Sequence, residues 1–392
     1  MRRDIIVFGD DWERHPQTLE HIAKSWARQH RVIWVNSLGH KRFQFSWRYV
    51  SRMLEKIWIA TRVTPPRSDG ITIVKPLTIP FHQYRFVRRL NGWLLERLLK
   101  RHMRRLGVGR PVLCTNSPMM GELVGRLNES VVAYYCTDDY PAFPDAFESM
   151  PEIESEMLGK TDIAFFVSEK LLTERRPRPI HAFAMSQGVH EGHFADHVQP
   201  PDPVVAAIRK PIIGFMGWLT HWVDLDLIHA VALHRPDWSF VWVGSAAVDI
   251  RPYTATANMH FVGARSYPDL PSAAQLFDVG LIPFKLNELT LGSNPLKLLE
   301  YFAMGIPVVS TPLPEVARYR PLVRIAASVD ETEDAIEKAL VERGASASRK
   351  RRSIAQCHSW DMLAREQFKR ILVSERERLE RSAAPQRQRL DT

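Results

Sequence analysis

The sequence has few cysteines and no long apolar run, and both absences narrow the class of protein. Its 392 residues include three cysteines, Cys114, Cys136 and Cys357, an odd number with wide spacing. Such spacing gives neither a disulfide framework nor a zinc-binding pattern. No apolar stretch approaches the ~18 residues of a membrane-spanning helix, and the chain runs from Met1 directly into the strand-like segment 4–8 without a signal-type core. The sequence therefore predicts a cytoplasmic protein.

Three common catalytic motifs are also absent. After Phe8 the chain reads GDDWER rather than G-x-G-x-x-G, so a nicotinamide cofactor has no support. The sequence contains neither a G-x-x-x-x-G-K-[ST] loop nor a G-x-S-x-G elbow, which removes support for P-loop ATP hydrolysis and for a serine hydrolase. It shows no pattern of metal ligands either, and we expect no metal and no cofactor.

The sequence does contain two series of apolar runs that alternate with helical patterns. Hydrophobic residues make up 45% and charged residues 25%, as in soluble globular proteins. Strand-like runs lie at 5–8, 31–35, 71–74, 111–114, 131–136 and 163–167, and again at 212–216, 240–243, 260–262, 279–284, 306–310 and 323–326. This spacing predicts an α/β protein with two Rossmann-like, doubly wound domains.

A proline-rich polar segment separates the two series and sets the predicted boundaries. The predicted parts are a first domain at 1–198, a linker at 199–211, a second domain at 212–355, a helix at 356–380 and a disordered tail at 381–392. At about 150 residues per domain, two domains also suit the length of the chain.

The segment SNPLKLLEYFAMGIPVVST at 293–311 predicts a helix that leads into a buried strand. Asn294 can cap this helix, Pro295 suits its first position and Gly305 can end it. Because the run at 279–284 is strand-like as well, the unit is β-loop-α-β and implies a parallel sheet. The helix N-terminus then faces the edge of the sheet where anions bind, and the expected ligand is a phosphate.

Two charged side chains lie on one face of this predicted helix. Lys297 and Glu300 are three residues apart, and Glu300 stands roughly 9 Å along the axis from the cap at ~1.5 Å per residue. Lys297 could neutralise a phosphate, and the carboxylate of Glu300 could accept hydrogen bonds from a ribose 2′,3′-diol. The alternative is an ordinary surface Lys/Glu pair.

Further candidates follow other apolar runs, because open parallel sheets bind ligands beyond the carboxyl ends of their strands. Gly217 follows the first run of the second half and would let backbone approach a phosphate, unless it is only a turn glycine. Ser293 directly precedes the predicted cap. Arg265 and Tyr267 follow a later strand, where a base could stack or be hydrogen-bonded, and an exposed loop is the alternative.

The first half offers three candidates for acid–base chemistry. Asp138 and Asp139 directly follow the buried run at 131–136, where an acceptor hydroxyl could meet them. Neighbouring carboxyl groups can push each other's pKa values apart, although both could instead cap the segment that follows. His15 follows the first strand and could bind an acceptor or a phosphate, or have no functional role.

The positive charge of the chain lies in its first third. Residues 1–110 contain 23 Lys/Arg and 8 Asp/Glu, a net charge of +15 within a total of +9. The densest part, 84–107, places apolar residues at helical spacing among eight Lys/Arg and one Glu, and a second basic, aromatic stretch lies at 40–58. Such a helix can bind an anionic membrane surface. The alternative is a core helix with a solvated outer face.

These residues give the chain a resemblance to the two-domain GT-B glycosyltransferases of the group 1 type, which move a sugar from a nucleotide diphosphate to an acceptor. Four segments carry it in the family's order: SQGVHEGHF at 186–194, IIGFMGWL at 212–219, LFDVGLIPF at 276–284 and PLKLLEYFAMGIPVVST at 295–311. The resemblance implies a GT-B fold with an interdomain cleft, donor binding in the second domain and a C-terminal helix that returns to the first domain.

The resemblance also implies roles for single residues. Glu300 corresponds to the second glutamate of the family's E-x7-E motif, which binds the ribose, and Lys297 takes the place of the basic residue beside the phosphates. The first glutamate of the motif falls on Gly292, which leaves its contacts with the transferred sugar to Ser293, Asn294 or backbone. The family needs no metal, because helix dipoles and basic side chains offset the charge of the leaving diphosphate.

The prediction is thus a cytoplasmic, peripheral glycosyltransferase that uses a UDP- or GDP-sugar and a lipid-linked or polysaccharide cell-envelope acceptor at the inner membrane face. One alternative is a sugar-nucleotide epimerase of the same architecture, which would need no acceptor. Another is a basic nucleic-acid-binding protein. Because the basic residues lie in amphipathic helices rather than in a recognised reading module, we expect no nucleic acid partner.

Overall fold

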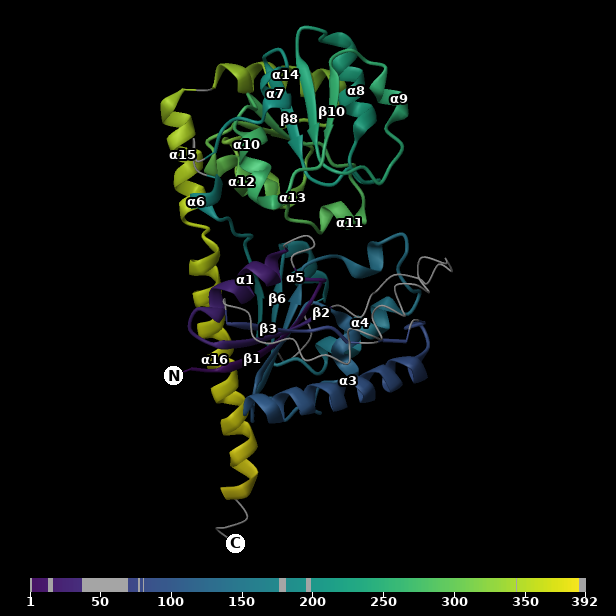
Figure 1. Ribbon diagram of the computed structural model, residues 1–392, viewed down its shortest axis with the longest axis vertical. Coiled ribbons are helices and arrows are strands. Elements are labelled where there is room, and N and C mark those ends of the chain that lie inside the picture. The colour runs from purple at the N-terminus through teal and green to yellow at the C-terminus, as the bar shows by residue number, and fades with distance from the viewer. Residues whose placement is uncertain are drawn as a thin grey trace. The chain divides into compact units, whose positions relative to one another are not determined.

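A computed structural model describes residues 2–12, 17–36, 70–76, 78–79, 81–175, 181–194, 199–342 and 344–387 (Figure 1). His15 and the basic stretch at 40–58 lie outside the described residues. The chain forms two units, one of Met1–Met185 with Leu363–Thr392 and one of Ser186–Met362. Each unit is an open α/β sheet with its own buried core, as the two series of apolar runs predict.

The first unit contains a parallel sheet of seven strands in the order β3-β2-β1-β4-β5-β6-β7. Its strands are β1 (Asp4–Gly9), β2 (Arg31–Asn36), β3 (Ile71–Val74), β4 (Val112–Thr115), β5 (Val131–Cys136), β6 (Ile163–Phe166) and β7 (His181–Ala184). The strand β7 was not predicted from the sequence. Its four residues are only partly buried at the edge of the sheet, so they lack the apolar run of a central strand.

Helices of the first unit arise from amphipathic segments between these strands. They are α1 (Thr18–Ala27), α3 (Arg85–Leu106), α4 (Met150–Leu158), α5 (Glu169–Arg175), and the short 3-10 turns η1 (Pro118–Glu122) and η2 (Tyr140–Ala142). The longest of them, α3, ends at Gly107, whose φ of 66° is the left-handed conformation that glycine adopts most readily. Among the described residues no helix combines the length and the apolar character needed to cross a bilayer.

The last helix, α16 (Trp360–Arg387), passes from the second unit to the first, as the family resemblance implies. The indole of Trp26 on α1 donates to the carbonyl of Ala364 at 2.9 Å, and Arg3 forms an ion pair with Glu375 at 2.9 Å. Figure 1 shows α16 alongside α1 and β1. The helix continues to Arg387, so the expectation of disorder from residue 381 is wrong for 381–387, where Ala383 and Ala384 have high helix propensity.

The second unit contains a six-stranded parallel sheet in the order β10-β9-β8-β11-β12-β13. Its strands are β8 (Ile212–Met216), β9 (Ser239–Val243), β10 (Met259–Gly263), β11 (Val279–Ile282), β12 (Val308–Ser310) and β13 (Val323–Ile325). All twelve strands predicted from the sequence are therefore present in the two sheets, with ends shifted by no more than two residues.

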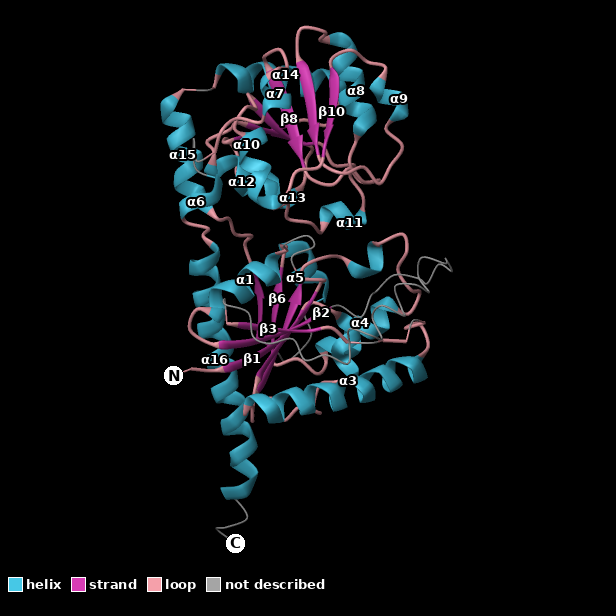
Figure 2. Cartoon of the chain, in the orientation of Figure 1, coloured by secondary structure: helices cyan, strands magenta, loops and turns pink. Residues whose placement is uncertain are grey.

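Helices cover both faces of the second sheet (Figure 2). Two of them, α8 (Leu225–His234) and α14 (Val329–Val341), pack together on one face, and α10 (Leu270–Ala274), α12 (Lys297–Ala303) and α15 (Ala345–Gln356) lie on the other. The remaining short elements are α6 (Glu191–Phe194), α7 (Pro203–Ala206), α9 (Arg251–Thr254), η3 (Tyr267–Asp269), α11 (Glu288–Leu291) and α13 (Pro314–Ala317).

The division between the units differs from the predicted boundaries. The first unit ends at Met185 rather than at 198, and the segment 199–211, predicted as a linker, lies within the second unit. Asp202 is buried there and accepts hydrogen bonds from the backbone N–H groups of Val204 and Val205 at the start of α7. Prolines in this segment start a capped helical turn instead of a free linker.

Candidate functional site

The second sheet has its topological switch point between β8 and β11. From β8 the chain goes first to β9 and β10 on one side, and it then returns through β11, β12 and β13 on the other side. In open α/β sheets ligands bind beyond the carboxyl ends of the strands at such a point. The loops that follow β8 and β11, and the helix α12, therefore define where a ligand is expected.

Three neighbouring strands end in glycines with positive φ. Gly217 follows β8 with φ of 130°, Gly244 follows β9 with φ of 158°, and Gly263 ends β10 with φ of 78°. The N–H of Gly217 donates to the carbonyl of Val243, and a Cβ on Gly244 would lie 1.8 Å from the carbonyl oxygen of Gly217. The positive φ values favour glycine at all three positions, and at Gly244 a side chain would also clash with backbone. Approach of a phosphate to the backbone at Gly217 stays a prediction.

Lys297 lies at the start of α12 and reaches this glycine edge. Its Nζ lies 4.8 Å from the ring centre of Phe215 and 4.6 Å from that of Phe284, and its Cε would lie 3.4 Å from a Cβ on Gly217. Burial lowers the pKa of Lys297 to about 8, against the opposing effect of Glu300. Lys297 is thus a cation held among aromatic rings beside the glycine that ends β8.

Glu300 lies one turn further along α12 and is partly buried as well. Burial raises the pKa of its carboxyl group to about 7, and Lys297 counteracts this shift. Within the described residues, no cation lies within salt-bridge distance of Glu300 and no carboxylate lies within that distance of Lys297. The pair is therefore not the exposed ion pair considered as the alternative.

Two desolvated charges without close ionic partners lower the free energy of unfolding of the ligand-free protein. Groups of this kind, with pKa values shifted toward neutrality by burial, concentrate at sites that bind a ligand. Since a phosphate would compensate the ammonium group and hydroxyl donors would compensate the carboxylate, the geometry suits a ligand that carries both.

Burial raises the pKa of the Tyr267 phenol, and the nearby negative charge of Glu300 raises it further. Its ring stacks on that of His193 at 4.9 Å, and His193 bonds to the carbonyl of Tyr267 at 2.9 Å. Arg265, predicted to contact a base, is instead engaged by the protein: it pairs with Asp202 at 2.6 Å and donates to the carbonyl of Val262. Its proposed ligand contact has no support from this geometry.

The segment before α12 differs from its prediction. The helix begins at Lys297 with Leu296 at the N-cap, and no side chain caps it, so Asn294 as cap and Pro295 as first helical residue are wrong. A tighter turn precedes the helix, in which the N–H of Leu298 donates to the carbonyl of Pro295. The carbonyl of Asn294 accepts from the side chain of Gln187 at 3.0 Å.

The hydroxyl group of Ser293 is already engaged in a hydrogen bond within the protein. The hydroxyl donates to the carbonyl of Thr290 at 2.7 Å, across the end of α11. Gly292 is the C-cap of that short helix, so the loop before α12 is a compact turn. Contacts of Ser293 and Asn294 with a ligand remain predictions that no observation here tests.

In the first unit the two adjacent aspartates have different surroundings. The carboxylate of Asp139 is buried and forms ion pairs with Arg175 and, at 3.8 Å, with Lys170. These partners hold Asp139 in a network of ion pairs. Burial raises the pKa of Asp138 to about 7, with the charge of Asp10 as the next cause.

Asp10 is a residue that the sequence analysis did not select. It follows β1, and Asp138 follows β5, so both stand beyond the carboxyl ends of strands in one sheet, separated by β4. The hydroxyl of Thr137 donates to Asp138 at 3.2 Å. The position of Asp10 directly after the first strand was the available signal. In the described parts of the chain, no three His, Cys, Asp or Glu side chains form a metal-binding group.

Comparison with known proteins agrees with this arrangement. Residues 210–342, which include β8, α12 and the switch point, match the family described as glycosyl transferases group 1. The matched residues make up most of the second unit, Ser186–Met362. The resemblance predicted from the sequence is therefore confirmed, and Lys297 and Glu300 lie inside the matched residues.

One curated relative is described as a glycosyltransferase as well, and solved structures show a similar fold. A candidate teichuronic acid biosynthesis glycosyltransferase, TuaH of Bacillus subtilis (strain 168), is 32% identical over 211 residues, which are 51% of this chain and 52% of TuaH. The alignment thus spans about half the length of that relative. Sucrose-phosphate synthase from Thermosynechococcus elongatus is similar in structure, with a TM-score of 0.70, 15% identity and coverage of 95% of this chain and 100% of that one.

Two further structures hold uridine nucleotides. HepE of Anabaena, in complex with UDP and glucose, has a TM-score of 0.63, 14% identity and coverage of 94% of this chain and 99% of that one. A trehalose-6-phosphate structure from E. coli, bound with UDP-2-fluoro glucose, has a TM-score of 0.68, 12% identity and coverage of 94% of this chain and 98% of that one. At these identities the likeness shows the fold alone, and the two units have the GT-B fold.

Proposed function

We propose that the protein is a glycosyltransferase that moves a sugar from a nucleotide diphosphate to an acceptor hydroxyl. The observation that carries the proposal is the pair Lys297 and Glu300, two desolvated charges without close ionic partners at the switch point of a group 1 domain. A nucleoside diphosphate compensates both, because its phosphates are anionic and its ribose diol donates hydrogen bonds.

In this proposal the diphosphate lies between Lys297 and the backbone after Gly217. The bond between the anomeric carbon and the diphosphate breaks, and the ammonium group of Lys297 stabilises the negative charge that develops on the leaving oxygen. The acceptor oxygen forms the new bond to the anomeric carbon. Since the charge is offset by a side chain, the proposed reaction needs no metal ion.

The acceptor hydroxyl must lose a proton, and we propose Asp138 as the group that takes it. Of the three candidates, Asp139 is held in ion pairs and His15 lies outside the described residues, whereas the carboxyl group of Asp138 has a pKa near neutrality. Such a group is ionised in part at pH 7 and can accept a proton at this pH. Asp10 faces it and helps to keep its proton affinity high.

The proposed donor is a UDP- or GDP-sugar, and the proposed acceptor is a lipid-linked or polysaccharide precursor of the cell envelope. Two structural neighbours bound to uridine nucleotides support the donor class. The name of TuaH, which refers to teichuronic acid biosynthesis, supports the acceptor class. The glycine at position 292 leaves the recognition of the transferred sugar to Ser293, Asn294 or backbone.

A thermal-shift panel of UDP, GDP, ADP and their sugars tests this function. At a ~100-fold excess over the dissociation constant, a true ligand adds about 2.7 kcal/mol to the free energy of unfolding. We expect at least one nucleotide and its sugar to raise the midpoint. If none does, the proposal is wrong, and if a UDP-sugar is converted to its epimer without any acceptor, the enzyme is an epimerase instead.

The variant Asp138→Asn, measured in the same panel, distinguishes nucleotide binding from sugar transfer. This variant is expected to keep the nucleotide-induced shift and to lose sugar transfer roughly 100-fold or more, the usual contribution of a positioned proton acceptor. Transfer is measured as release of the free nucleotide from its sugar in the presence of a bacterial membrane extract. Asp145→Asn, a change at another aspartate of the same unit, serves as the control. Unchanged transfer by Asp138→Asn would remove Asp138 from the mechanism.

We further propose that α3 binds an anionic membrane surface. Val87, Asn91, Leu95, Leu99 and Met103 form its buried face. The opposite face presents Phe86, Leu90, Trp93 and Leu94, which are 38–70% exposed, and continues toward the C-terminus with exposed Arg97, Arg101 and Arg104. Exposed apolar side chains beside cations match the interior and the headgroups of an anionic bilayer.

The membrane proposal predicts that Phe86→Ser with Trp93→Ser weakens vesicle binding. Removing two side chains that enter the bilayer costs ~1.5–3 kcal/mol each when they are fully buried there, which corresponds to at least tenfold weaker binding. Sedimentation with vesicles of phosphatidylglycerol and phosphatidylcholine measures this. The control is Leu233→Ser, a change of an apolar residue on α8 that is 62% exposed. Equal binding by the double variant, or preferential binding of wild type to DNA, would contradict the proposal.

A further inference from the structure

Pairing between β8 and β11 ends before the carboxyl ends of these strands. β8 pairs with β9 over all five of its residues, from Ile212 to Met216. With β11 it forms only two residue pairs, Ile213 with Val279 and Gly214 with Gly280. Beyond Gly214 the two central strands therefore separate, and backbone groups that a ladder would satisfy need other partners.

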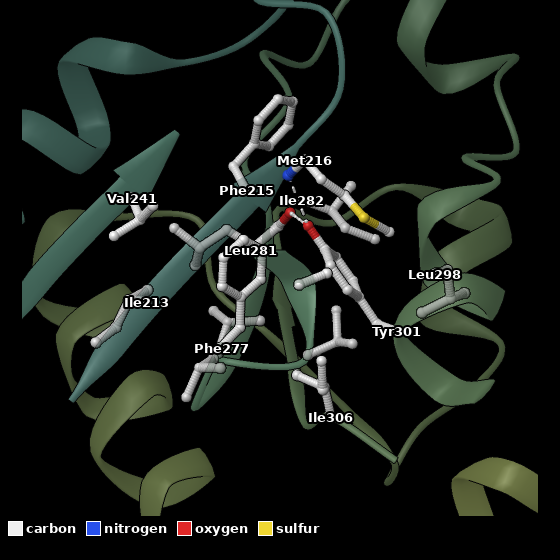
Figure 3. Close-up of a cluster of buried hydrophobic side chains, with 14 of the residues drawn as sticks. Ile213, Phe215, Met216, Val241, Phe277, Leu281, Ile282, Leu298, Tyr301 and Ile306 are labelled. Carbon is white, nitrogen blue, oxygen red and sulfur yellow. Dashed lines mark hydrogen bonds between the residues drawn. The ribbon is translucent and has the colours of Figure 1, made fainter. Parts of the chain in front are cut away.

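The hydroxyl group of Tyr301 occupies this gap (Figure 3). It accepts a hydrogen bond from the N–H of Met216 at 3.0 Å. It lies 3.4 Å from the carbonyl oxygen of Gly214 and 3.5 Å from that of Leu281, to which it can donate. Tyr301 is fully buried, so one side-chain oxygen bridges β8 and β11 where their main chains no longer meet.

The ring of Tyr301 has a matching surface on β11. A Cβ on Gly280 would lie 2.7 Å from its Cδ2 atom, so the ring lies directly against the backbone of that glycine. Phe277 packs near it with ring centres 6.4 Å apart. The absence of a side chain at position 280 thus allows the tyrosine to reach between the strands, and the ring has little room to move.

This bridge connects three parts of the candidate site. Met216, whose N–H it accepts, is followed directly by Gly217, and Gly217 lies against the side chain of Lys297. Tyr301 itself follows Glu300 on α12. A single hydroxyl group therefore relates the end of β8 to the helix that carries both charged residues.

We propose that Tyr301 is a positioning residue for nucleotide binding, holding the backbone at Met216 and Gly217 at a fixed distance from Lys297 and Glu300. The role in nucleotide binding rests on the proposed function, whereas the role in positioning the backbone of Met216 and Gly217 does not. Without the hydroxyl, the N–H of Met216 has no partner between the strands, and the end of β8 can shift relative to α12.

The test compares Tyr301→Phe with Ser310→Ala. Both changes remove one buried hydroxyl from the second unit; that of Ser310, on β12, donates to the carbonyl groups of Thr311 at 2.8 Å and Ile282 at 3.2 Å. The phenylalanine keeps the ring on Gly280, so the fold is retained. Denaturant unfolding, calorimetric titration with UDP and hydrogen exchange of backbone amides are measured for both variants and for wild type.

We expect both variants to lose similar free energy of unfolding, but only Tyr301→Phe to bind UDP about tenfold more weakly, which corresponds to ~1.4 kcal/mol. Its Met216 and Gly217 amides should also exchange faster than those of Ser310→Ala. Wild-type affinity in Tyr301→Phe, or an equal loss in Ser310→Ala, would overturn the inference. If wild type binds none of UDP, GDP and ADP, the proposed function fails, and amide exchange at Met216 still decides whether Tyr301 positions the strand.

Discussion

Replacement of Glu300 by alanine is expected to abolish the stabilisation that a nucleotide gives to the wild-type protein. In the proposed complex its carboxylate accepts two hydrogen bonds from the ribose diol, and hydrogen bonds to a charged group contribute ~1.5–3 kcal/mol each. Their loss weakens binding by roughly 100-fold or more. At the nucleotide concentration that adds about 2.7 kcal/mol to wild type, the variant should show almost no shift.

A second signature of Glu300 appears without any ligand. Because burial raises the pKa of this carboxyl group to about 7, above its value in the unfolded chain, the folded protein loses stability as the pH rises from about 4.5 through 7. Glu300→Gln carries no such charge, so it should be more stable than wild type above pH 7, by on the order of 1–3 kcal/mol. Denaturant unfolding at pH 5 and pH 8 measures the difference.

The matched control for Glu300 is Glu337→Ala. Glu337 is an exposed glutamate on α14 that forms an ion pair with Arg235, and its removal should change neither nucleotide binding nor the pH dependence of stability. The donor-site assignment is wrong if Glu300→Ala responds to nucleotides as strongly as the parent protein does.

Replacement of Lys297 by methionine is expected to remove recognition of the diphosphate and to spare recognition of the nucleoside. Methionine keeps the apolar stem between Phe215 and Phe284 but lacks the ammonium group. We expect UDP to bind at least 100-fold more weakly, as for a charge-assisted contact in a desolvated site, while uridine binds wild type and variant alike. Calorimetric titration with both ligands measures this. Lys338→Met, on the exposed face of α14, is the control.

The pH dependence of UDP binding should report the same two groups. Binding needs Glu300 ionised and Lys297 protonated, and their pKa values are about 7 and about 8. Affinity is therefore highest between these values, falls below pH 7 as Glu300 gains a proton, and falls above pH 8 as Lys297 loses one. In Lys297→Met the decline above pH 8 should disappear. A decline that persists in this variant would assign it to another group.

The sequence predicted that Lys297 and Glu300 share one face of a helix, but it did not predict which residues surround them. The three-residue spacing of Lys297 and Glu300 places them on one helical face wherever the helix lies, so this relation could be read directly. Whether the pair is exposed or desolvated depends on Phe215, Phe284 and Gly217, which belong to distant strands and loops. No local pattern contains that information.

The adjacent aspartates of the first unit make the same point. Asp138 and Asp139 are equivalent candidates in the sequence, and the structure separates them because Arg175 and Lys170 on α5 reach only Asp139. Tyr301 was not predicted as a functional residue, since its bridge to Met216 spans 85 positions in the chain. Contacts of this kind arise from the packing of elements and have no periodicity.

What the sequence determined by itself was the architecture: two α/β units, twelve of the strands described, and a helix with two charges after a strand. Periodic apolar patterns suffice for this, because a strand or helix must bury whichever face its side chains define. Only the tertiary structure decided where the units divide and which aspartate is held in ion pairs. It also decided that Lys297 and Glu300 are desolvated and have no close ionic partner among the described residues. Burial and pairing are properties of neighbours in space, which the order of residues does not specify.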